Sequence, residues 1–117
     1  MDPIIYELGV SISPYLGNLT FLHSLNLSNN ALHGYIPTQL GRLFHLRELW
    51  LYNNQLEGNI PSDLGNCKNL ANLALSYNDL TGSIPQKLGS LTHLQVLFLG
   101  ANNLTSTIRL PLETSWF

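Results

Sequence analysis

The stretch Leu43–Asn66, LFHLRELWLYNNQLEGNIPSDLGN, is one unit of a pattern that recurs along the chain every 24 residues. Its leucine and asparagine positions fall into columns that contain Leu22, Leu46, Leu70 and Leu94; Leu25, Leu49, Leu73 and Leu97; Leu27, Leu51, Leu75 and Leu99; and Asn30, Asn54, Asn78 and Asn102. Such a period is typical of a solenoid, in which each unit forms one coil that cannot bury its own apolar face. Stacked coils join these faces into one core, so the repeat predicts the fold.

Each unit is predicted to contain a short strand, a buried asparagine and a helical return. The segment Glu48–Tyr52 alternates leucine with other residues, as a half-buried strand does. Asn54 ends that strand, and its carboxamide both donates and accepts, so the asparagine column is predicted to satisfy turn backbone groups of its own and the adjacent coil. Gly58 suits a bend, and the helix-like return Asp63–Gly65 is predicted to stop at its glycine.

The repeat register covers most of the chain and predicts a single domain. Residues 1–7 are predicted to be an irregular lead-in, and 8–112 form the repeat domain, with a partial repeat at 8–18. Repeats start at 19, 43, 67 and 91, so about four and a half repeats are expected, and 113–117 is a non-repeat C-terminal tail.

Composition excludes several functional classes. The 117 residues carry a net charge of −2 with no basic face, so no nucleic-acid partner is predicted. The lone Cys67 excludes an internal disulfide, and its place in a column of leucines predicts a small buried hydrophobe. No apolar run approaches the roughly 20 residues that span a bilayer. Met1–Leu16 lacks the basic start of a signal peptide and is interrupted by prolines.

No catalytic or metal-binding motif is present in the sequence. It lacks H-E-x-x-H, G-x-S-x-G and a glycine-rich phosphate loop, so it predicts neither an enzyme nor a cofactor. Of the four histidines, His45 and His93 share a column, but they lie two coils apart, about 10 Å by strand spacing. That separation is too large for one ion, so no metal site is predicted.

The unit LxxLxxLxLxxNxLxGxIPxxLGx resembles the plant-type leucine-rich repeat, and Ile12–Thr20 is similar to early ectodomain repeats of plant leucine-rich-repeat receptor-like kinases. The resemblance implies an α/β solenoid, a right-handed superhelix with a short parallel sheet on the concave face. It also implies protein or peptide recognition in receptor-type signalling or defence, a co-receptor as a further partner, and an extracellular or cell-surface location. The family's cysteine-bearing cap, signal peptide, membrane helix and kinase are absent from this sequence. A fragment, a truncated product and a small stand-alone relative all stay open.

The residues that flank the strand leucines are predicted to form the binding face. Aromatic residues and arginine are frequent interface anchors, and an outward apolar cluster needs an explanation. The alternative is that Trp50 and Phe98 only shield the sheet. The predicted partner-binding residues are Arg47, Glu48, Trp50, Tyr52, Asn72, Tyr77 and Phe98.

Three N-x-S/T sequons, at Asn18, Asn26 and Asn103, are predicted to carry glycans if the protein is secreted. A glycan on Asn26 would stand on the concave face and limit binding there.

Two other functions remain as alternatives. One is a stand-alone extracellular inhibitor of the polygalacturonase-inhibitor type, or an ice-binding repeat protein. Ice binding needs even rows of threonine or serine, which the uneven row Thr20, Phe44, Lys68 and Thr92 does not supply. The other is a structural role with self-association through open solenoid ends, because solenoids usually need polar caps and this chain ends in Trp116 and Phe117.

Overall fold

The computed structural model describes residues 10–105 and, for the backbone, 115–116. The predicted lead-in at 1–7 lies outside the described residues, as does most of the segment that follows Thr105.

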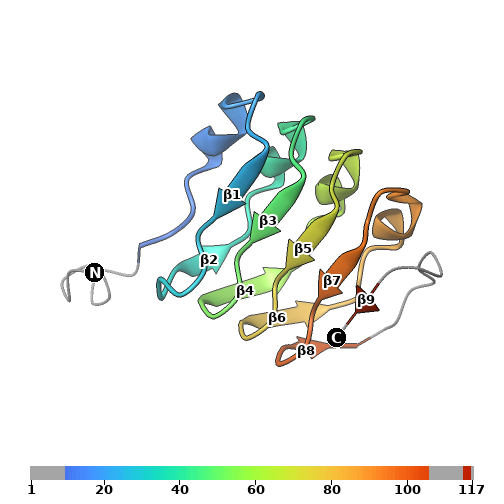
Figure 1. Ribbon diagram of the computed structural model, residues 1–117. Coiled ribbons are helices and arrows are strands. Elements are labelled where there is room, and N and C mark those ends of the chain that lie inside the picture. Colours follow the sequence, from blue (N-terminus) through green and yellow to red (C-terminus); the bar gives the residue numbers. More distant parts are fainter. Residues whose placement is uncertain (1–9, 106–114, 117) are drawn as a thin grey trace.

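One parallel sheet runs along the solenoid and joins strands from successive coils (Figure 1). Its order is β1-β3-β5-β7-β9, and in the first four strands each residue pairs with the residue 24 positions later, as Leu25 does with Leu49. The strands are β1 (Ser24–Asn26), β3 (Glu48–Trp50), β5 (Asn72–Ala74), β7 (Val96–Phe98) and β9 (Ser115–Trp116). The predicted solenoid with a short parallel sheet is therefore confirmed.

The fifth strand lies in the segment 113–117, for which the sequence predicts a non-repeat tail. Ser115–Trp116 in this segment pairs in parallel with β7. Trp116 lies opposite Leu97, 19 residues after it instead of 24. Strand pairing uses backbone groups, so a strand can extend the sheet without the leucine spacing.

A second parallel sheet, which the repeat pattern does not predict, has the order β2-β4-β6-β8 (Figure 1). Its paired residues are 22 positions apart, so Glu57 lies opposite both Tyr35 and Asp79. Gly58 makes the predicted bend, with a φ of 76°. A Cβ atom on Gly58 would lie 2.6 Å from Cε1 of Tyr35, so this glycine also gives the Tyr35 ring its space. The strands are β2 (His33–Tyr35), β4 (Gln55–Asn59), β6 (Asp79–Gly82) and β8 (Asn103–Leu104).

The returns between the sheets are 3₁₀-helices, not α-helices, in the described part of the chain. They are η1 (Pro14–Asn18), η2 (Thr38–Arg42), η3 (Ser62–Asn66) and η4 (Gln86–Ser90). Each has five residues, far too few to cross a membrane. The prediction that glycine stops the return is wrong, because Gly41 lies inside η2. A Cβ atom on Gly41 would lie 2.5 Å from the carbonyl oxygen of Asp63, so glycine is needed for close stacking of η2 on η3.

The core consists of the leucine columns, and Leu46, Leu49 and Leu51 are completely buried. Cys67 is also completely buried, as predicted, and its thiol donates to the carbonyl oxygen of Leu40 at 3.4 Å. Burial raises the pKa of the Cys67 thiol to about 11.

The predicted asparagine ladder is confirmed. Nδ2 of Asn54 donates at 3.0 Å to the carbonyl oxygen of Leu51 in its own coil and to that of Leu27 in the preceding coil. Its Oδ1 accepts from the amides of Asn30 and Leu32, also at 3.0 Å. Each such carboxamide therefore joins two neighbouring coils.

Candidate binding surface

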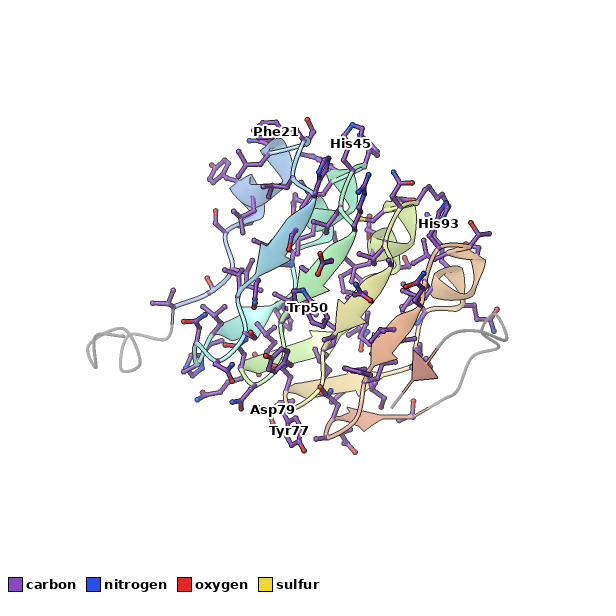
Figure 2. All side chains as sticks on the ribbon, viewed as in Figure 1. Phe21, His45, Trp50, Tyr77, Asp79 and His93 are labelled. Atoms are coloured by element: carbon purple, nitrogen blue, oxygen red, sulfur yellow. The ribbon has the colours of Figure 1, made fainter. Side chains whose placement is uncertain are left out.

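An apolar stripe crosses the outward face of the five-stranded sheet. Trp50 pairs with Ala74, and Ala74 pairs with Phe98, so the three residues form one row across β3, β5 and β7. Trp50 and Phe98 are half-buried, whereas Ala74 is completely buried although its row faces outward. The two aromatic side chains therefore cover Ala74, and Figure 2 shows Trp50 at the middle of the sheet.

Polar residues flank the stripe and orient Trp50. Nε1 of Trp50 donates to Oε2 of Glu48 at 3.2 Å, which satisfies the indole N–H and holds the ring. Glu48 pairs with Ser24 on one side and with Asn72 on the other, while Arg47 next to it is exposed. The predicted residues Glu48, Trp50 and Asn72 thus lie together on one face, and Arg47 directly precedes this face in the sequence.

The two predicted tyrosines lie in the turns beyond the strands. Tyr52 is half-buried, and its carbonyl oxygen accepts from the amide of Asn29 at 3.1 Å. Tyr77 is 65% exposed and has a φ of 57°. The same left-handed conformation occurs at Asn29, Asn53 and Ala101. Asparagine tolerates this conformation, whereas for a bulky residue it is an outlier that costs about 1–2 kcal/mol.

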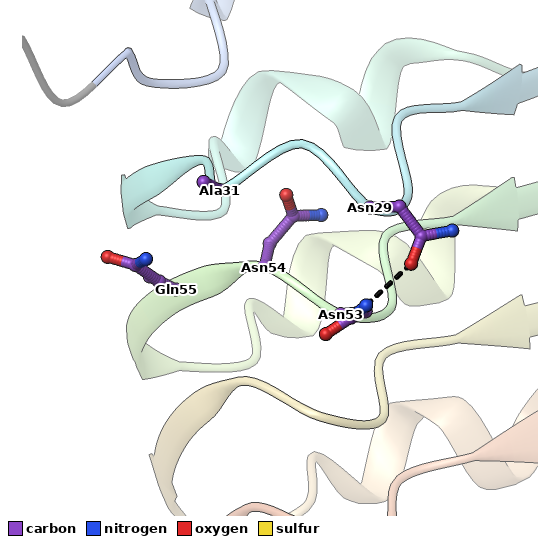
Figure 3. A pocket seen from close by; sticks show the side chains of 5 residues that line it. All are labelled: Asn29, Ala31, Asn53, Asn54 and Gln55. Atoms are coloured by element: carbon purple, nitrogen blue, oxygen red, sulfur yellow. Dashed lines mark hydrogen bonds between the residues drawn. The ribbon is translucent and has the colours of Figure 1, made fainter. Parts of the chain in front are cut away.

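A polar depression of about 240 Å³ lies at the turns of the first two described coils (Figure 3). Nδ2 of Asn53 donates to Oδ1 of Asn29 at 2.6 Å within it. The Asn54 carboxamide is engaged in the ladder. This depression is therefore built mainly around internal hydrogen bonds. Its lining residues are Asn29, Ala31, Asn53, Asn54 and Gln55.

An apolar depression of about 280 Å³ lies at the same turns two coils further on, and it is lined by Ser76, Tyr77, Phe98, Gly100 and Ala101. Tyr77 and Phe98 were predicted from their residue type, but the three small residues were not. The available signal was Gly100, which interrupts the column of Ser28, Tyr52 and Ser76 and leaves a hollow where another coil has a ring.

The predicted separation of His45 from His93 is seen in Figure 2, where the two lie on different coils. His23 and His45 do lie close together, with ring centroids 6.1 Å apart in an edge-to-face arrangement. This pair was not predicted from the sequence, because the two histidines belong to different columns of the repeat. Within the described ranges, no three histidine, cysteine, aspartate or glutamate residues come together as a metal site would require.

The sequon asparagines Asn18, Asn26 and Asn103 are all exposed. Oδ1 of Asn26 accepts from the amide of Ser28 at 3.1 Å and from its hydroxyl at 2.6 Å, so this side chain is engaged within its own turn. Glycosylation at the three positions stays a prediction.

Comparison with known families agrees with this architecture. The family model described as Leucine Rich Repeat matches residues 21–43, 45–67 and 69–91, which together make up more than half of the chain. The chain belongs to the leucine-rich repeat family.

The similar proteins include plant receptors of much greater length. A putative receptor-like protein kinase of Arabidopsis thaliana is 57% identical over 28 residues, which are 24% of this chain and 3% of the kinase. The crystal structure of PEPR1 with AtPEP1 is 41% identical and has a TM-score of 0.81. The match covers 88% of this chain and 14% of the chain in that structure.

Two further structures show different uses of the same repeat. The Arabidopsis receptor kinase HAESA, in complex with the peptide hormone IDA and the co-receptor SERK1, is 38% identical with a TM-score of 0.76, over 80% of this chain and 16% of its own. A plant ice-binding protein is 36% identical with a TM-score of 0.75, over 83% of this chain and 32% of its own. This chain therefore spans a small part of the receptor chains and about a third of the ice-binding protein.

Proposed function

We propose that this chain is a non-catalytic recognition module that binds a peptide or protein across the concave, outward face of its five-stranded sheet. The observation that carries the proposal is the apolar stripe of Trp50, Ala74 and Phe98. Both aromatic side chains remain partly exposed on a rigid surface. Partly exposed aromatic residues supply much of the binding energy at protein interfaces.

The dimensions of the stripe suit an extended peptide. Neighbouring strands lie about 4.8 Å apart, so the stripe from β3 to β7 extends about 10 Å. An extended chain rises about 3.3 Å per residue, so about three peptide residues would cross the stripe. Glu48 and Asn72 beside the stripe supply an acceptor and a carboxamide for the peptide backbone, and exposed Arg47 supplies a cation.

The similar receptors support the kind of partner. PEPR1 was crystallised with AtPEP1, and HAESA with a peptide hormone and a co-receptor. By analogy we propose a peptide ligand, a co-receptor as second partner, and a role in receptor-type signalling or defence for this module.

The double variant Trp50→Ala/Tyr52→Ala tests the proposal. Immobilised protein is exposed to plant extract, and the retained peptides and proteins are identified by mass spectrometry. We expect the double variant to lose species that the wild type retains, while its circular dichroism spectrum is kept. The matched control Tyr15→Ala/Phe21→Ala removes two aromatic side chains that are 80% and 71% exposed on the first coil, and it should retain those species.

Two outcomes would contradict the assignment. If the double variant retains the same species as the wild type, the stripe is not the binding surface. If it unfolds instead, Trp50 and Tyr52 serve the fold, in line with the shielding alternative.

The ice-binding neighbour favours a second candidate, but the exposed surface argues against it. Thr20, Phe44, Lys68 and Thr92 are all exposed, so the phenylalanine and the lysine interrupt this row of threonines. The inhibitor function also remains a prediction.

Self-association through the solenoid ends remains a prediction as well. Among the described residues, Leu22, Leu25 and Leu27 of the first coil are only partly buried, whereas the same columns are completely buried in the next coil. This exposure of core leucines is the observation that supports it.

A further inference from the structure

We propose that the depression between Tyr77 and Phe98 is a subsite for the cationic side chain of an arginine or lysine in the bound peptide. The inference rests on the proposed function, because it assigns one residue of the peptide that the sheet would bind. Three features carry it: the shape of the depression, the charge around it, and the backbone conformation of Tyr77.

The shape of the depression suits a single side chain. Tyr77 and Phe98 supply aromatic surface, and Ser76, Gly100 and Ala101 leave the space between them open. Its volume of about 280 Å³ is below the roughly 300–1,000 Å³ of pockets that hold whole small molecules. The faces of aromatic rings attract ammonium and guanidinium groups, so a long cationic side chain gains both apolar contact and cation–π attraction.

The charge at this end of the molecule favours a cation over a neutral side chain. Asp79 follows Tyr77 by two residues, and Figure 2 shows both at the same end of the molecule. Glu57 lies opposite Asp79 on the neighbouring strand, and both are exposed. Like charges on paired positions destabilise a sheet. This exposed negative charge at the same end of the molecule favours the approach of a cationic side chain.

Among the described residues, no lysine or arginine lies next to Glu57 or Asp79 in the sequence or opposite them on a paired strand. The turns and second-sheet strands occupy residues 28–35, 52–59, 76–83 and 100–105, and these segments contain neither lysine nor arginine. The described cations Arg42, Arg47, Lys68 and Lys87 all come from the helical returns or the segments that lead into the first sheet.

Tyr77 adopts a left-handed backbone conformation that is costly for a bulky side chain. The two preceding coils have Asn29 and Asn53 in this left-handed position, where asparagine is tolerated and tyrosine is strained. Backbone strain of this kind is concentrated at binding sites. Tyr77→Asn is therefore expected to make the protein more stable and at the same time to remove one wall of the subsite.

The test is an NMR titration of the isotope-labelled full chain with acetyl-Gly-Arg-Gly-amide. The same tripeptide with norleucine or glutamate in place of arginine tests whether the subsite accepts an apolar or an anionic side chain. We expect saturable shifts at the Tyr77 and Phe98 rings and the Gly100 amide with the arginine peptide. Its affinity should be about three to ten times that for the norleucine peptide, as one or two exposed cation–π contacts allow. The glutamate peptide should cause no saturable shift.

The variants separate the parts of the proposal. Tyr77→Asn should abolish the shifts while raising the melting temperature, and Asp79→Asn should weaken arginine binding without affecting norleucine binding. Tyr15→Ala, on the first coil, should leave the titration unchanged. Equal binding of norleucine and arginine would show an apolar subsite and overturn the proposal, as would arginine binding that survives Tyr77→Asn. Neither result depends on Trp50 and Tyr52, so failure of the subsite is distinguishable from failure of the proposed binding face.

Discussion

Removal of the Asn54 carboxamide should be among the most damaging single changes in this protein. Asn54 is 9% exposed and makes four hydrogen bonds of 3.0 Å, two as donor and two as acceptor. The variant Asn54→Ala leaves two carbonyl oxygens and two amides without these partners. At about 1 kcal/mol for each bond, the loss is about 4 kcal/mol. A domain of this size has a total stability of about 5–15 kcal/mol, so a large part of it would be lost.

The same column offers graded comparisons. Asn78 donates to the carbonyl oxygens of Leu51 and Leu75 and accepts from the amide of Leu56, all at 3.0 Å. Asn30 is only half-buried and donates within its own turn. We therefore expect losses of about 3 kcal/mol for Asn78→Ala and about 1–2 kcal/mol for Asn30→Ala.

Urea unfolding followed by circular dichroism measures these differences, provided that the slope of the transition is the same in all variants. The expected order of destabilisation is Asn54, then Asn78, then Asn30. If all three variants lose the same free energy within about 0.5 kcal/mol, the bonds between coils contribute nothing beyond the local turn, and the argument from the ladder is refuted.

Two other predictions concern packing and titration. Gly41→Ala should destabilise the protein by about 1–3 kcal/mol in the same assay, because the added Cβ atom would meet the backbone of Asp63. The control Thr38→Ala, at an exposed site in η2, should change the stability little. Equal effects of the two substitutions would contradict the close stacking of η2 on η3. Since the pKa of buried Cys67 is raised from 9.0 to about 11, its contribution to stability should be intact below pH 9 and lost as the pH rises toward 11. Cys67→Ala should show a smaller fall in unfolding free energy between pH 8 and pH 10.5, and an equal fall in both proteins would assign the pH dependence to other groups.

Much of the fold was predictable because the repeat places equivalent residues in equivalent environments. The leucine columns and the asparagine ladder each depend on chemistry within one unit and its neighbour. The outward direction of Trp50 and Phe98 follows from strand alternation alone. Tyr77 was predicted from its residue type alone, because aromatic residues are frequent interface anchors.

Other features were not predictable, because they depend on how the coils meet. Gly41 was interpreted as an end signal, but its reason is the nearby backbone of Asp63. Strand alternation places Ala74 on the outward face, yet Trp50 and Phe98 cover it. The hollow beside Gly100 exists because larger groups surround a missing side chain. The column that ends in Gly100 indicates the missing side chain, but not the groups from other columns that surround it.

The amino-acid sequence alone specifies a stack of coils, its buried leucines, its asparagine ladder and the face that carries Trp50. These features follow from the spacing of the residues and from the chemistry of each residue type. The stagger of two residues in the second sheet, which brings Glu57 opposite Asp79, and the depression between Tyr77 and Phe98 arise from contacts between residues of different coils. The angle and offset at which one coil lies on the next result from the packing of all their side chains together, so these features are visible only in the folded molecule.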